Sequence, residues 1–247
     1  MSASVRVAAA GDIHIGCDTE GRMAAALAGI DSCADVLLLA GDLTQVGSDD
    51  EARCLVAELA EVPIPIIAVL GNHDHHAGEP ERVVQCLHDA GITVLDGTVT
   101  TIDLNGLQLG IAGIKGFGGG FLGRAASDFG EPEMRAFARH SVDTAARLER
   151  CLDVLDGDVR IVLLHYSPVP DTLAGEPPEL FPFLGSYLLA EAIDRTLPDL
   201  VIHGHAHRGT ERGVTPGGVR VRNVALPVLG APFRVYELPA ESHHRPS

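Results

Sequence analysis

Five apolar runs of this 247-residue chain end in side chains that commonly bind metal ions. The set combines imidazole, carboxylate and carboxamide groups, which suit first-row divalent ions such as Mn, Fe, Zn or Ni. It holds more candidate ligands than one ion needs, so we expect two ions. In chain order the residues are Asp12 and His14, Asp42, Asn72 with His73 and Asp74, His165, and His205 with His207.

The stretch 71–74, Gly-Asn-His-Asp, shows the pattern most clearly. It follows the short β-branched run 66–70, which is typical of a buried strand. A strand that ends this way places an amide, an imidazole and a carboxylate where the backbone turns. Asp12 and His14 are two residues apart, and in an extended segment that spacing puts both side chains on one face.

Each motif also has an ordinary structural explanation when it stands alone. A single His205 is more often a surface or hydrogen-bonded histidine than a ligand, and Asn72 suits a turn. The Asp-x-His pair could itself be a turn, and Asp42 could cap or turn the chain. We prefer the ligand interpretation because these explanations would have to hold together at five strand ends of one chain.

The local patterns predict the elements that position these residues. Helices are expected over 23–33, 49–60, 79–90, 132–155 and 186–197, with capping residues and acids at 48–51. Strands are expected over 5–10, 36–40, 66–70, 93–95, 99–104, 107–114, 160–164 and 200–202, with antiparallel strands over 210–238. Strands alternate with helices early and hairpins come later, which predicts a mixed α/β fold of packed layers. Because ligands bind outside the carboxyl ends of strands in open α/β sheets, we expect the candidate residues to converge there.

Two long stretches have no regular period. Residues 115–132 are rich in Gly and carry three Phe residues, and residues 167–185 are rich in Pro. Loops of this length are often functional, so both are expected to shape a substrate pocket. Their Phe side chains could stack on a base, cover the site or belong to the core. The glycines at 116–120 lack the Gly-Lys-Ser/Thr of a nucleoside-triphosphate loop.

Composition limits the class of protein. Hydrophobic residues make up 46% of the chain and no linker divides it, so we expect one domain over 1–240 and a loose tail over 241–247. A net charge of -16 argues against a long nucleic-acid partner. It does not argue against a small phosphorylated substrate, because bound divalent ions would reverse the local field.

Other sequence features concern the compartment. The five cysteines are scattered and odd in number, which favours reduced thiols in a cytoplasmic protein. Cys17 is of interest because it closely follows Asp12 and His14. No secretory signal is visible, and no apolar run approaches the roughly 20 residues of a membrane span. We therefore expect no membrane partner, while the pattern does not indicate an oligomeric state.

The motifs, taken together, resemble those of the calcineurin-like metallophosphoesterases in order and spacing. The resemblance spans residues 12–207. It implies two packed mixed β-sheets flanked by helices, a four-layer sandwich, with a two-metal site at the strand ends. The motifs are Asp12-x-His14, Gly41-Asp42, Gly71-Asn72-His73-Asp74, His165 and Gly204-His205-x-His207.

The resemblance also implies a role for each residue. Asp12, His14 and His207 would bind one metal ion; Asn72, His165 and His205 would bind the other. Asp42 would bridge the two ions. His73 would lie near the phosphate oxygens or the leaving group, and Asp74 would orient its ring. The nearby His75, His76 and His203 match no ligand position and are expected at the rim or behind the ligands.

Differences from the motifs of related subfamilies narrow the choice of subfamily. Purple acid phosphatases place a tyrosine three residues after the bridging aspartate, and here that residue is Gln45. Serine/threonine protein phosphatases carry Glu after Asn-His, and here Asp74 follows. The sequence looks more like the bacterial phosphodiesterase branch. That branch often has a His-Pro-Pro segment, which His165-Tyr166-Ser167-Pro168 matches only in part.

The expected activity is hydrolysis of a small phosphodiester or nucleotide, including a cyclic nucleotide. A metal-bridging hydroxide would attack phosphorus, and His73 would stabilise charge or protonate the leaving oxygen. Two alternatives remain open: a phosphomonoesterase with the same site, and a non-catalytic scaffold on the same fold. A DNA nuclease is disfavoured by the acidic composition.

Overall fold

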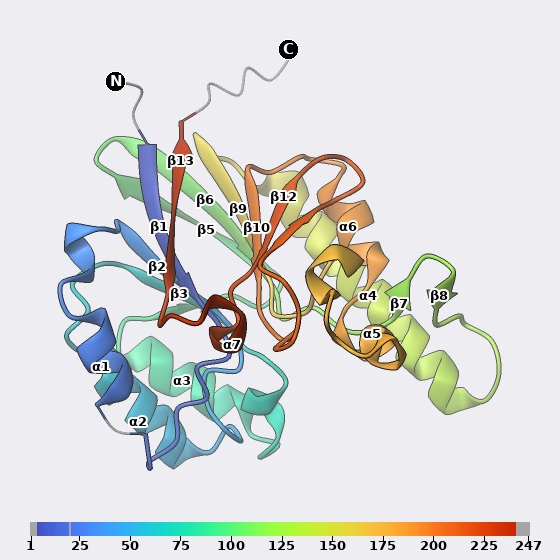
Figure 1. Cartoon of the computed structure of the whole chain (residues 1–247), viewed down its shortest axis with the longest axis horizontal. Coiled ribbons are helices and arrows are strands. Elements are labelled where there is room, and N and C mark those ends of the chain that lie inside the picture. Colours follow the sequence, from blue (N-terminus) through green and yellow to red (C-terminus); the bar gives the residue numbers. More distant parts are fainter. Residues whose placement is uncertain (1–3, 20, 241–247) are drawn as a thin grey trace.

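The computed structural model describes residues 4–19 and 21–240 (Figure 1). The tail expected at 241–247 lies outside the described residues. The first sheet has the strand order β13-β1-β2-β3-β4. Its strands are β1 (Ser4–Ala10), β2 (Val36–Ala40), β3 (Ile66–Val69), β4 (Thr93–Val94) and β13 (Arg234–Pro239).

The second sheet has the order β11-β12-β10-β9-β6-β5. Its strands are β5 (Thr98–Leu104), β6 (Leu107–Gly113), β9 (Val159–Leu163), β10 (Leu200–His203), β11 (Arg212–Val214) and β12 (Arg220–Asn223). β6, β9 and β10 are parallel to one another, as are β1, β2 and β3. Both sheets therefore deliver three or more parallel strand ends to one edge.

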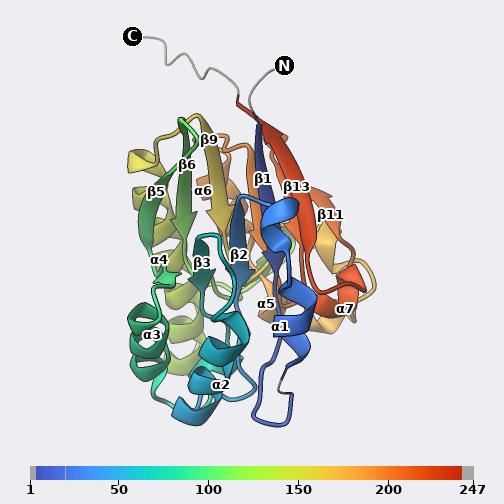
Figure 2. The ribbon, with the colours of Figure 1, turned by 90° about the vertical axis from the view of Figure 1, so that its left-hand side faces the viewer.

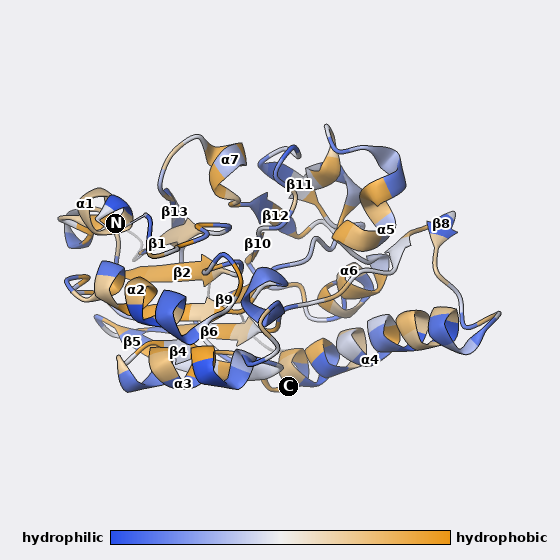
Figure 3. Cartoon of the chain, turned by 90° about the horizontal axis from the view of Figure 1, so that it is seen from below, coloured by the Kyte–Doolittle hydropathy of each residue, from blue (hydrophilic) through white to orange (hydrophobic). Residues whose placement is uncertain are grey.

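The two sheets pack face to face. Successive side chains of a strand point to opposite faces of its sheet, so one set can pack against the other sheet. Val5, Val7 and Ala9 of β1 pack with residues of the second sheet such as Ile161 and Ile202. The neighbouring side chains of the same strand face the other way, toward helices. Figure 3 shows the hydrophobic colouring of β2, β6 and β9, which lie inside these layers.

Helices cover the outer faces. The first sheet is covered by α1 (Arg22–Leu27), α2 (Asp49–Leu59) and α3 (Pro80–Asp89). The second is covered by α4 (Pro132–Val154) and α6 (Tyr187–Ile193). This arrangement confirms the predicted fold of two mixed sheets flanked by helices. No helix among the described residues is both long and apolar enough to span a membrane.

The start of α2 follows the predicted capping signal. The Ser48 hydroxyl accepts a hydrogen bond from the backbone N–H of Glu51 at 3.3 Å. The Glu51 carboxylate accepts one in return from the backbone N–H of Ser48 at 3.4 Å. This reciprocal pair satisfies N–H groups that the first turn of a helix leaves free.

Several predicted elements differ in detail. The helix expected over 23–33 ends at Leu27, because Gly29 adopts a left-handed φ of 71°, and a short 3-10 turn, η1 (Ile30–Ser32), follows. Residues 115–132 contain the hairpin β7 (Gly120–Phe121) and β8 (Arg124–Ala125). Residues 167–185 contain η3 (Pro170–Leu173), η4 (Pro178–Leu180) and α5 (Phe181–Leu184).

The carboxyl-terminal strands do not form one antiparallel group. β11 and β12 are antiparallel, but β12 pairs in parallel with β10. After α7 (Leu226–Leu229), β13 crosses to the first sheet and pairs antiparallel with β1. The first and last strands therefore lie side by side, as Figures 1 and 2 show.

Candidate metal centre

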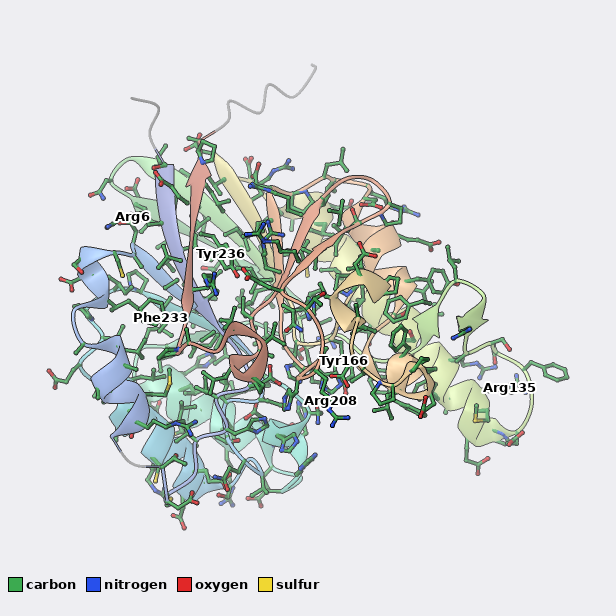
Figure 4. All side chains as sticks on the ribbon, in the orientation of Figure 1. Arg6, Arg135, Tyr166, Arg208, Phe233 and Tyr236 are labelled. Carbon is green, nitrogen blue, oxygen red and sulfur yellow. The ribbon has the colours of Figure 1, made fainter. Side chains whose placement is uncertain are left out.

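The predicted ligands converge where the two sheets meet. A hydrogen bond of 2.8 Å joins His165 Nδ1, after β9, to the carbonyl of Ala40 at the end of β2. The candidate ligands form two groups, and within each group the ligand atoms lie within 4.8 Å of one another. One group is Asp12, His14, Asp42 and His207; the other is Asp42, His165 and His205. Tyr166 and Arg208, which directly follow two of these residues, mark the region in Figure 4.

Four of these residues have a positive φ: 55° at Asp12, 44° at His14, 49° at Asp42 and 70° at His205. Side-chain-bearing residues adopt this conformation rarely, and such strain tends to accumulate at functional sites. The expectation that Asp12 and His14 lie in an extended segment is therefore wrong, although their candidate ligand atoms do lie together in one group. The chain turns at both residues, and backbone hydrogen bonds hold it along residues 41–43.

Asp12 connects the first group to the segment that carries His205 and His207. Its carboxylate lies 2.8 Å from His207 Nε2 and accepts the backbone N–H of His205 at 2.9 Å. Burial raises the pKa of Asp12 to about 6, against the lowering effect of the His207 hydrogen bond. The same hydrogen bond raises the pKa of His207. His14 Nε2 lies 3.9 Å from Asp42 Oδ2.

The second group is more deeply buried. His165 is fully buried, and desolvation lowers its pKa, so its imidazole is neutral near pH 7. Because Nδ1–H donates to the Ala40 carbonyl, Nε2 presents a lone pair. That lone pair faces Asn72 Oδ1 at 3.0 Å and Asp42 Oδ1 at 3.3 Å. Burial lowers the pKa of His205 to about 3.

This donor set fits divalent cations. The electron-rich atoms His165 Nε2, Asn72 Oδ1 and Asp42 Oδ1 converge. A cation between them would stabilise this arrangement, whereas the His165 proton is on Nδ1 and cannot. Within the described part of the chain, His14 Nε2 and Asp42 Oδ2 are buried without any hydrogen-bond partner. Buried polar atoms are rarely left unpaired, so these two atoms also point to an ion.

His73 and Asp74 are placed differently from each other. His73 Nδ1 lies 2.7 Å from the backbone carbonyl of Gln45, and Nε2 lies 3.9 Å from Asp42 Oδ2. The prediction that Asp74 orients the His73 ring is wrong, because the Gln45 carbonyl holds that nitrogen. A main-chain acceptor has no signature in the sequence, so sequence reasoning could not have found it.

Asp74 instead ties two ligand-bearing loops together. Its buried carboxylate accepts backbone N–H groups of Gly71 at 2.8 Å, Thr44 at 2.8 Å and Leu43 at 3.2 Å. It also accepts the Thr44 hydroxyl at 2.6 Å. Burial raises its pKa. Asp74 therefore fixes the loop after β2, which carries Asp42, against the loop after β3.

The remaining histidines near the motifs have separate positions. His75 and His76 are exposed, and the His76 ring lies 4.4 Å from that of His73. His203 is fully buried, where its Nε2 lies 2.9 Å from the Thr172 hydroxyl. Burial lowers the pKa of His203 to about 4. It therefore lies behind the candidate ligands and not at the rim.

Two motif glycines keep the ligands close to the backbone. A side-chain carbon at Gly71 would collide with the Asp42 carboxylate, and one at Gly204 would collide with that of Asp12. Both positions therefore require the smallest residue, which explains the Gly before Asn72 and the Gly before His205.

Sequence reasoning missed Lys115 and Tyr166. β6 runs parallel to β9, so Lys115 lies at a sixth strand end of the same edge. Its carbonyl accepts the backbone N–H groups of His165 at 2.9 Å and Tyr166 at 3.0 Å. The buried Tyr166 ring packs 4.3 Å from the His205 ring. The apolar run before Lys115 was the signal that could have revealed it.

Comparisons with known proteins agree with this geometry. The profile of the calcineurin-like phosphoesterases matches residues 5–209. Phosphopantetheinyl hydrolase from Mycobacterium tuberculosis is similar in structure, with a TM-score of 0.68, 17% identity and 100% of each chain covered. TT1561 of Thermus thermophilus is also similar in structure, with a TM-score of 0.57 and 18% identity, and the match covers 97% of this chain and 100% of the other. Comparison with curated proteins gives no match. Because the profile covers most of its length, this chain belongs to the calcineurin-like phosphoesterases, metal-dependent hydrolases of phosphoesters.

Proposed function

We propose that this protein is a dinuclear metallophosphoesterase that hydrolyses a small phosphodiester or nucleotide. The observation that carries the proposal is that both ligand groups share Asp42. A carboxylate has two oxygens, and here Oδ1 faces His165 while Oδ2 faces His14. One residue can therefore contact two ions at once, which the reaction class requires.

The donor set divides between the two ions. Asp12, His14 and His207 would hold one, and Asn72, His165 and His205 the other, with Asp42 between them. When bound, the pair of ions supplies a water acidified toward neutral pKa and neutralises the charge of the phosphoryl oxygens. Mn, Fe, Zn and Ni all suit such ligands, and Mn is the ion to test first.

The protein's own contribution lies in positioning and proton transfer. The Gln45 carbonyl holds His73 Nδ1–H, so Nε2 is the atom free to hold a proton for the leaving oxygen. Asp74 acts only through the loops that it fixes. No side chain in this arrangement needs to form a covalent intermediate with the substrate.

The phosphodiesterase preference rests on the motifs. Gln45 and Asp74 stand where two phosphatase subfamilies have other residues, and the sequence resembles the bacterial phosphodiesterase branch. A phosphomonoesterase with the same ligands is the second candidate, because the ligands do not distinguish the two esters. The cytoplasmic location expected from the cysteines is part of the same proposal.

The test compares wild-type protein with Asp42→Asn and, as a control, the exposed Asp153→Asn. Each protein is stripped of metal, supplied with Mn, and assayed with bis-4-nitrophenyl phosphate and 4-nitrophenyl phosphate. We expect faster diester turnover, two Mn per wild-type chain, and loss of turnover only in Asp42→Asn. Faster monoester turnover would move the assignment to a phosphatase. Full activity of Asp42→Asn, or wild-type protein without bound metal, would overturn the proposal.

A further inference from the structure

A cavity of about 640 Å³ lies beside the candidate metal centre. It is bounded by α3, residues 94–96, the end of β6 and α4. Leu70 and His75, which flank the 71–74 motif, both line it. Its volume is typical of a site for a small organic ligand, for which the range is about 300–1,000 Å³.

Lys115 lines the cavity, and its backbone carbonyl accepts the N–H of the candidate ligand His165 at 2.9 Å. Lys115 is the only lysine among the 247 residues, although the chain contains many arginines. Its ammonium group lies 5.9 Å from the centroid of the Tyr166 ring, which in turn packs 4.3 Å from His205. The cation is thus one aromatic ring away from a candidate metal ligand.

Among the described residues no carboxylate forms an ion pair with Lys115, although the charges of Asp96, Asp42 and Asp74 act, against the lowering effect of burial, to raise its pKa. Arg147 is paired with Asp96, at 3.0 Å. Glu81 is exposed on α3, and the exposed His140 packs against Phe117. In the described residues Lys115 is half-buried and its ammonium makes no hydrogen bond or ion pair. The Tyr166 ring is a cation–π partner of this ammonium but carries no net charge, so an anionic ligand would stabilise the half-buried cation further.

The rest of the lining suits an uncharged organic group. Apolar side chains from α3, β4 and the segments that follow β3, β4 and β6 contribute to it; they include Leu70, Val84, Val94, Leu95 and Ile114. The cavity therefore combines an apolar wall with one ammonium group near the reacting end. That ammonium is a compact point charge, which Arg at the same position would not reproduce.

We propose that this cavity binds the organic part of the substrate and that Lys115 binds a second phosphate group carried by it. The inference rests on the proposed function, since it places the reacting phosphoester at the metal centre. The substrate class is then a phosphoester whose organic part bears a further phosphate a few bonds from the reacting one.

The first experiment uses two esters that differ by one phosphate. Thymidine 5'-(4-nitrophenyl phosphate) and its 3'-phosphorylated form share the nucleoside and the leaving group. We expect wild-type kcat/KM to be about tenfold higher for the 3'-phosphorylated ester, from one charge-assisted contact. Lys115→Met should bring the ratio close to one, Lys115→Arg should restore it in part, and the exposed Arg53→Met on α2 should leave it unchanged. A wild-type ratio of one, or a preference that survives in Lys115→Met, would overturn the inference.

The second experiment does not depend on turnover. Because the chain has a single lysine, acylation of its side chain by sulfo-NHS acetate can be followed at one peptide by mass spectrometry. We expect thymidine 3',5'-bisphosphate to protect Lys115 at concentrations where thymidine 5'-monophosphate does not. Equal protection, or none, would overturn the assignment of Lys115. Failure of both esters to hydrolyse would instead count against the proposed function, so the two failures are distinguishable.

Discussion

The two ligand groups share Asp42, but water reaches them to different extents. In the group with His165, that side chain is fully buried. In the group with Asp12, the side chains of His14 and His207 are 25% and 41% exposed. We call these groups the buried half-site (Asn72, His165, His205) and the open half-site (Asp12, His14, His207).

Protonation sets His207 apart from the other candidate ligand histidines, because burial also lowers the pKa of His14 in the open half-site. Burial lowers the pKa of His165 and His205, so their rings are neutral and ready to bind an ion near pH 7. The Asp12 hydrogen bond raises the pKa of His207, so a proton competes with an ion there. The comparison teaches that the fold itself prepares the buried half-site, whereas pH acts on one ligand of the open half-site, His207.

The largest effect is expected from the buried half-site. His165→Ala removes a neutral ligand that no solvent can replace at a fully buried position. We expect permanent loss of one Mn per chain and a fall in turnover of roughly a thousandfold, which corresponds to several kcal/mol. Metal analysis and diester hydrolysis measure both, with the exposed His88→Ala as the control. Full recovery in excess Mn would contradict the distinction between the half-sites.

A smaller effect is expected from the open half-site. His207→Ala leaves a position that water can fill, so Mn affinity should fall by about tenfold to a hundredfold. Excess Mn should restore most of the turnover. Titration of the metal-free variant with Mn, followed by activity, gives the affinity. Loss that no Mn concentration reverses would show that the open half-site is as strict as the buried one.

The junction between the half-sites can be tested through Asp74. Asp74→Asn replaces an acceptor of four hydrogen bonds by a group that also donates, so we expect unfolding free energy to fall by about 2–3 kcal/mol. Thr44→Val removes one of these bonds and should cost about 1 kcal/mol. Urea unfolding at constant m-value measures both. Equal stability of Asp74→Asn and wild type would show that the carboxylate does not fix these loops.

The last prediction concerns pH and the buried His203, which lies behind the candidate ligands. The pKa of His203 is about 4 in the folded metal-free protein, against an ordinary value of 6.5. Below pH 6.5 the unfolded chain takes up a proton that the folded chain refuses, so this contribution to stability is full above 6.5 and is lost as pH falls toward 4. The expected slope is at most about 1.4 kcal/mol per pH unit.

His203→Gln should flatten that slope in urea unfolding measured from about pH 4 to 7. Asp12 acts in the opposite direction, because its folded pKa of about 6 makes the folded chain bind a proton more readily. Asp12 is present in both proteins, so its contribution cancels when the slope of His203→Gln is compared with that of the wild type. An unchanged slope would show that His203 does not titrate as its burial indicates.

The sequence predicted those features that are local. Each motif follows its own strand within a few residues, so strand ends such as Asp42 after β2 could be located from periodicity alone. The family resemblance then predicted which ligands would meet, and Asp42 does lie in both groups of candidate ligands. The helix start at Ser48, with its capping residue and first-turn acids, is equally local and was predicted correctly.

Features that depend on distant backbone could not be predicted. The left-handed φ of Asp12 and His14 arises because their segment pairs with the backbone of residues 41–43. The Gln45 carbonyl that holds His73 is the same in every residue type. The cavity at Lys115 combines segments from residue 70 to residue 147, so no single window of sequence contains it.

The pairing of β1 with β13 and of Asp12 with His207 has a consequence for how the protein is made. Asp12 and His207 are 195 positions apart, and β13 follows later still. A ribosome that adds about 5–20 residues per second separates the two ligands by about 10–40 s. During that interval the first sheet lacks its outer strand and the open half-site lacks its last ligand. The nascent chain therefore cannot complete the open half-site before residue 207 has been synthesised, and metal loading there must wait for that residue.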